Sequence, residues 1–131
     1  MNTPLVHLTL DQVLAVHRRV IEEFGGDPEV RDRGLLESAI GMPAASFGGR
    51  PLHPGPATQA AAYLFHLSKN HPFVDGNKRT ALAVAEIFLR LNGHRLDATD
   101  QELVDLPLGV TAGTTSKQDV TAFFQQRVSA C

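Results

Sequence analysis

"TQAAAYLFHLSKN" (residues 58–70), "HPFVDGN" (71–77) and "KRTALAVAEIFLRL" (78–91) follow one another without a break, and together they decide the fold. The first and third segments are rich in alanine and leucine, which strongly favour helix. Asn92-Gly93 then forms a C-terminal stop. Because apolar side chains lie on most sides of the third segment, we expect neighbouring helices to cover it. The stretch therefore predicts two helices, the second of them central, joined by a polar loop.

Two further helices are predicted ahead of this stretch. Thr9 and Gln12 have the spacing of a capping box, and apolar residues recur at helical spacing from residue 10 to residue 24. Asp32 can cap a second, short helix that ends near Gly41. The glycines and prolines of "FGGRPLHPGP" (residues 47–56) then predict a loop without regular structure.

Two more helices are predicted after the stretch, at about residues 100–110 and, with Ser116 as cap, at residues 116–127. No segment shows a persuasive strand pattern. The predicted fold class is therefore all-α, a compact bundle of about six helices with the polar loop at the N-terminus of the central one.

Size and composition limit the classes of function. A chain of 131 residues suits a single domain (residues 1–131), and 43% hydrophobic with 20% charged residues is typical of a globular protein. A net charge of -2 and a pI near 6.3 argue against a broad basic face for direct nucleic-acid binding. The only cysteine is Cys131, which excludes an internal disulfide and fits a reducing cytoplasm. No leader or membrane span is expected.

The polar loop carries the chemistry. Its position before a helix offers free backbone N–H groups and the positive end of the helix dipole, which together favour an anion. Gly76 lets the backbone approach a ligand or adopt a positive φ. Lys78 and Arg79 add positive charge where a helix disfavours it, unless an anion such as phosphate is bound there.

Three further side chains complete the parts needed for phosphoryl transfer. Asp75 beside a phosphate is a natural ligand for Mg²⁺, which takes few protein carboxylates. His71 can accept a proton from an attacking hydroxyl near neutral pH. Asn77 could either orient a phosphate or bond the loop to itself.

Each residue also has a simpler interpretation. A loop histidine is often an ordinary polar residue, and Asp75 could merely cap the following helix. Phe73 is interpreted as a core anchor, and His66 as a satisfied core histidine. The remaining four histidines show no partner in the sequence and receive no role.

"HPFVDGNKRTAL" (residues 71–82) resembles the central motif of the Fic superfamily, and the lysine after the asparagine makes it similar to the Doc branch, the toxins of Doc/Phd toxin–antitoxin modules. A looser similarity extends through residues 25–49, 60–70 and 88–98. The resemblance implies the same bundle of about six helices. It also implies that residues 30–49 form a flap that aligns the target chain. An equally good interpretation of this segment is a helix and a loop that pack on the bundle.

The resemblance also implies roles by position. His71 matches the general base, Asp75 the Mg²⁺ ligand, and Asn77 the phosphate-positioning amide. Gly76 with Asn77 matches the backbone anion nest, and Arg79 the phosphate-binding arginine. Fic-type enzymes transfer part of a nucleotide to a hydroxyl of a target protein. Doc-like toxins transfer the γ-phosphate of ATP to a threonine of elongation factor Tu, which makes ATP, Mg²⁺ and that factor the expected substrate, cofactor and target.

Two positions separate this chain from the AMP-transferring Fic pattern, which has glycine in place of Lys78 and arginine in place of Leu82. Both differences favour a Doc-like kinase. The alternatives are an AMP transferase and a non-catalytic binding module of the same fold. A metal-dependent phosphohydrolase is disfavoured, because no second histidine and aspartate cluster supplies more ligands.

Control by a second chain is the last expectation. Many Fic enzymes carry an inhibitory helix with Ser or Thr four residues before a glutamate, and none of the six glutamates here has that spacing. The resemblance therefore implies a Phd-like antitoxin whose C-terminal segment binds as a helix in a groove of the bundle.

Overall fold

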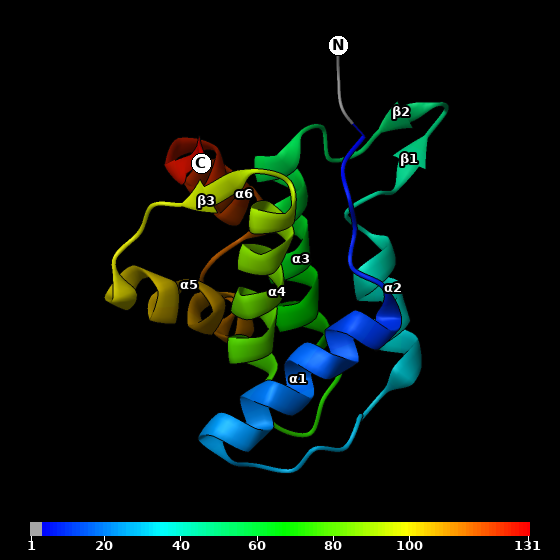
Figure 1. Ribbon diagram of the computed structural model, residues 1–131, viewed down its shortest axis with the longest axis vertical. Coiled ribbons are helices and arrows are strands. Elements are labelled where there is room, and N and C mark those ends of the chain that lie inside the picture. The colour runs from blue at the N-terminus through cyan, green and yellow to red at the C-terminus, as the bar shows by residue number, and fades with distance from the viewer. Residues whose placement is uncertain (1–3) are drawn as a thin grey trace.

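The computed structural model describes residues 4–131, and it confirms the all-α class (Figure 1). No helix in this range combines the length and the apolar character that a membrane span requires. The described residues form six helices, which are α1 (Leu10–Phe24), α2 (Arg33–Gly41), α3 (Pro56–Asn70), α4 (Asn77–Leu91), α5 (Asp100–Ala112) and α6 (Lys117–Arg127).

Helices α3 and α4 lie side by side at the centre of the bundle (Figure 1). Helix α1 packs on α4, α2 and α6 pack on α3, and α5 packs on both central helices. The prediction that α4 is covered by its neighbours is confirmed, and α3 is just as central. Alanines let neighbouring helices approach α3 closely, and the core is completed by large side chains that are almost fully buried: Tyr63, Leu64, Leu67, Val84, Phe88, Leu89 and Phe124.

The predicted caps set most helix starts. Thr9 and Gln12 form the capping box of α1, Asp32 accepts from the backbone N–H of Leu35 in α2, and Ser116 caps α6. An unpredicted box between Thr99 and Glu102 begins α5. Helix α3 starts two residues earlier than expected, because Pro56 stands at its first position, where a missing N–H costs nothing.

The expectation that residues 47–56 lack regular structure is wrong in part. Strands β1 (Ser46–Phe47) and β2 (Arg50–Pro51) form an antiparallel hairpin. Gly48 and Gly49 both have positive φ, 60° and 80°, as the tightest hairpin turns require. A second ribbon pairs β3 (His94–Leu96) with β4 (Val128–Ala130). These strands of two or three residues are too short to show the alternation by which strands are recognised in a sequence.

Candidate functional site

The loop between α3 and α4 begins with a strained backbone conformation. His71 has φ 50° and ψ 55°, and it is the only described residue other than glycine with a positive φ. This left-handed conformation is uncommon for a side chain with a β-carbon, and such residues cluster at functional sites where the surrounding structure holds them. The neighbours that hold His71 therefore define the site.

Arg31 holds the end of α3 and the start of the loop. Its guanidinium donates from Nε to the carbonyl of His71 at 2.7 Å and from the terminal nitrogen to the carbonyl of Asn70 at 2.9 Å. Its backbone N–H donates to the carbonyl of Pro72 at 2.7 Å. These bonds satisfy carbonyls that the end of a helix leaves unpaired. They also fix the backbone of His71 on both sides.

The buried side chain of Asn77 holds the loop through hydrogen bonds within it. This side chain is only 4% exposed, and it bonds both backbone groups of Phe73. Its oxygen accepts from the N–H of Phe73 at 2.9 Å, and its nitrogen donates to the carbonyl of Phe73 at 2.8 Å and to Nδ1 of His71 at 3.2 Å. Of the two roles open to Asn77, the structure therefore shows the loop bond. The backbone N–H of Asn77 still lies in the first turn of α4.

Phe73 anchors the loop in the core, as predicted, and His17 of α1 is its partner. Phe73 is 1% exposed, and its ring stacks on the His17 ring with centroids 3.7 Å apart and planes 6° apart. His17 Nε2 donates to the backbone carbonyl of Asp75 at 2.8 Å. A β-carbon on Gly76 would lie 3.2 Å from Ile21 and 3.4 Å from Val20. Helix α1 is thus packed directly under the second half of the loop.

The carboxylate of Asp75 lies at the surface, held by a loop from the other side. Its Oδ2 accepts from the backbone N–H of Asp27 at 2.8 Å. A β-carbon on Gly26 would lie 2.9 Å from the β-carbon of Asp75, so only glycine allows this approach. Asp75 does not cap α4, whose N-cap is Gly76. The contact with Asp27 orients the carboxylate while leaving Oδ1 free of hydrogen bonds among residues 4–131.

The first turn of α4 has several features that favour an anion. Gly76 has φ 81° and ψ 15°, and no side chain among the described residues caps the helix. Lys78 and Arg79 are both exposed on this turn, and the Arg79 guanidinium lies 3.7 Å from the centre of the Phe24 ring. Free N–H groups, the helix dipole and two cations act together there. This geometry would suit a phosphate.

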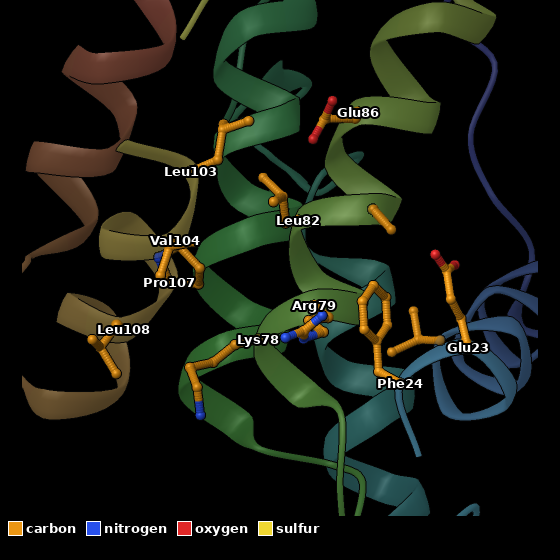
Figure 2. A pocket seen from close by; sticks show the side chains of 12 residues that line it. Glu23, Phe24, Lys78, Arg79, Leu82, Glu86, Leu103, Val104, Pro107 and Leu108 are labelled. Atoms are coloured by element: carbon orange, nitrogen blue, oxygen red, sulfur yellow. The ribbon is translucent and has the colours of Figure 1, made fainter. Parts of the chain in front are cut away.

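A groove leads away from this turn between α1, α4 and α5 (Figure 2). Its volume is about 470 Å³. Lys78 and Arg79 lie at one end, Leu82 is in the middle, and Glu86 is beyond it (Figure 2). Burial raises the pKa of the Glu86 carboxyl, and the positive charge of Arg90 opposes that shift. The α5 wall is apolar, with Leu103, Val104 and Leu108 facing the groove.

Comparison with known proteins identifies the family. Residues 7–89 match the sequence profile of the Fic/DOC family. This chain belongs to the Fic/DOC family. It is 34% identical to the "Protein kinase doc" of Escherichia phage P1 over 114 residues, which cover 87% of this chain and 89% of that protein. It is 49% identical to the "Toxin Doc" of Mycolicibacterium smegmatis over 75 residues, which cover 57% of this chain and 58% of that protein.

The donor set of this Fic/DOC protein fits Mg²⁺ bound together with a phosphate. Among the described residues no group of three or more histidines, cysteines or carboxylates could hold a metal ion by itself. Asp75 offers one exposed carboxylate beside the anion-binding turn. Mg²⁺ commonly uses one or two carboxylates and completes its octahedron with water and phosphate oxygens. Asp75 would therefore hold the ion, with substrate phosphates supplying further ligands.

The structure brings together the six residues that the sequence singles out in this Fic/DOC protein, because they span only nine positions from His71 to Arg79. It adds Arg31 and His17, which sequence reasoning missed. An isolated arginine in a loop and a lone histidine on an amphipathic helix give no signal of their role. Both act on the loop backbone rather than on side chains of the motif.

Proposed function

We propose that this protein is a Doc-like toxin kinase that transfers the γ-phosphate of ATP to a hydroxyl of a target protein. The observation that carries the proposal is the left-handed His71, held beside the uncapped first turn of α4 with the Asp75 carboxylate alongside. A base, a metal ligand and an anion site within one loop are the parts that phosphoryl transfer needs. The names of the two relatives, a toxin and a protein kinase, support the same reading.

His71 would act as the general base toward the attacking hydroxyl. Because the Asn77 amide nitrogen donates to Nδ1, a neutral His71 ring in this arrangement carries its hydrogen on Nε2. A ring that accepts a proton at Nε2 must first hold its hydrogen on Nδ1. Base action therefore requires the 3.2 Å contact with Asn77 to loosen.

The cations and N–H groups of α4 would position the phosphates. Arg79 and the backbone of Gly76 and Asn77 bind the transferred group, and Lys78 adds a point charge next to them. Mg²⁺, when bound, would neutralise charge on the bridging phosphate oxygens. Leu82, one turn further on, offers no charge to departing β- and γ-phosphates. This arrangement favours the γ-phosphate, rather than the α-phosphate, next to the attacking hydroxyl.

The target and the controlling partner follow from family resemblance. We propose a threonine of elongation factor Tu as the acceptor, so that transfer would block translation. We propose a Phd-like antitoxin as inhibitor, with a helix lying in the groove between α1, α4 and α5. Its apolar α5 wall suits an amphipathic helix, and such a helix would also cover Lys78 and Arg79.

Two parallel reactions on elongation factor Tu test the chemistry, one with label in the γ-phosphate of ATP and one with label in the α-phosphate. The kinase proposal expects label in the target only from the γ position. Label from the α position alone would instead establish an AMP transferase. Absence of label from either, with a nucleotide-binding signal intact, would support a non-catalytic module.

A further inference from the structure

A second cavity lies on the α6 side of α3 and shares no lining residue with the groove beside Arg79. Its volume is about 580 Å³, within the range of small-molecule sites. The segment before α3, together with the first turn of α3, forms one wall, and one face of α6 forms the other. Its polar lining consists of His53, Thr58, Lys117, Gln118, Thr121 and Gln125.

The lining of this cavity carries a positive charge and no negative one. Lys117 lines it without an ion pair to any described carboxylate, and no aspartate or glutamate is among its lining residues. Partial burial lowers the pKa of the Lys117 ammonium. His66 of α3 lies behind His53, with ring centroids 6.3 Å apart. Lys117 and two imidazole rings therefore lie in one region.

Two ring nitrogens in this cluster are buried without a hydrogen-bond partner among the described residues. They are Nδ1 of His53, a residue only 4% exposed, and Nε2 of His66. Leaving such a group unpaired destabilises the folded state, so buried orphan nitrogens in a native structure call for a partner. His53 is itself part of the cavity wall, but its Nδ1 is buried, so a molecule bound in the cavity meets this atom only if the ring turns.

We propose that this cavity binds a small organic phosphate, with Lys117 and His53 contacting the phosphate group. A phosphate presents several acceptor oxygens at once, which matches a cluster of donors better than a single carboxylate does. The cavity is larger than a bare phosphate, and the amides of Gln118 and Gln125 can bond the organic part. The exposed edge of Leu52 gives that part an apolar contact.

Both histidines have pKa values below that of a free imidazole. Burial, followed by the positive charges of Lys117 and His53, lowers the pKa of His66 to about 4. Burial and then Lys117 also lower the pKa of His53, and a hydrogen bond to the Met42 backbone has a smaller, raising effect. A negative charge bound between these groups would oppose the effect of Lys117 and raise both pKa values. The groups facing this cluster are then Lys117 from α6 and His53 and His66 from the α3 side.

Side-chain nitrogen resonances of the histidines, recorded by NMR on the whole protein, test the proposal. Inorganic phosphate and ribose 5-phosphate are titrated separately, with citrate as a carboxylate probe. We expect both phosphates to shift the His53 and His66 signals, with ribose 5-phosphate binding more tightly. Absence of these shifts at saturating phosphate, or shifts with citrate alone, would overturn the proposal.

Two variants locate the binding. Lys117→Met, which keeps the length of a partly exposed side chain, should weaken phosphate binding at least about tenfold, because it removes a charge-assisted contact. Arg79→Met should leave the His53 and His66 shifts unchanged. Equal binding by Lys117→Met, or loss of the shifts in Arg79→Met, would refute this cavity as the site. Circular dichroism of both variants confirms that each remains folded.

Discussion

Replacing Asn77 with alanine tests whether this side chain fastens the loop. The substitution removes two buried hydrogen bonds to the backbone of Phe73, at 2.9 and 2.8 Å. Each backbone group left unpaired costs about 1–3 kcal/mol, and water from the exposed Val74 and Asp75 side recovers part of that. We therefore expect the free energy of unfolding to fall by about 2–4 kcal/mol.

Urea denaturation followed by circular dichroism measures this change. Gln126→Ala serves as control, because it truncates an exposed amide in α6 that forms none of these bonds, and it should stay within about 0.5 kcal/mol of the wild type. If Asn77→Ala were as stable as this control, Asn77 would not fasten the loop. Its amide would then be free for phosphate, as the family resemblance alone implies.

Three further changes test other parts of the account. Arg31→Met should lower transfer at least about tenfold by freeing the His71 backbone, whereas Arg33→Met, which loses only an exposed ion pair within α2, should not; equal rates would remove Arg31 from the site. His66 has a folded pKa of about 4, below its unfolded value, so stability in phosphate-free buffer should fall as pH drops from about 6.5 to about 4, by less than the full shift implies because the ring is only partly buried; His66→Gln should flatten that slope, and an unchanged slope would contradict the burial effect. Asp75→Asn should abolish the Mg²⁺ dependence of transfer, and an unaltered metal titration would exclude Asp75 as the ligand.

The helices could be predicted because their signals are local. Caps such as Thr9 and Ser116 lie within three residues of the groups they bond, and apolar periodicity marks the faces that pack. The two short ribbons could not, because strands of two or three residues show no period. The Gly48-Gly49 turn is in hindsight the one available signal for the first ribbon.

The site also contains residues that the sequence could reveal and residues that it could not. The motif residues from His71 to Arg79 are contiguous, so their clustering was readable from the chain. The contacts of Arg31 and His17 join residues 40 and 58 positions apart, and nothing in a single sequence links such pairs. Asn77 could orient a phosphate or bond the loop with the same amide group, so only the geometry distinguishes these two roles.

Intact-mass analysis of elongation factor Tu, after incubation with this protein and Mg-ATP, tests the central claim most directly. We predict that the target gains the mass of one phosphoryl group, and that His71→Ala, folded by circular dichroism, produces about 10²- to 10⁴-fold less of this product. A gain of one adenylyl group, or an undiminished product with His71→Ala, would contradict a Doc-like kinase that uses His71 as its base.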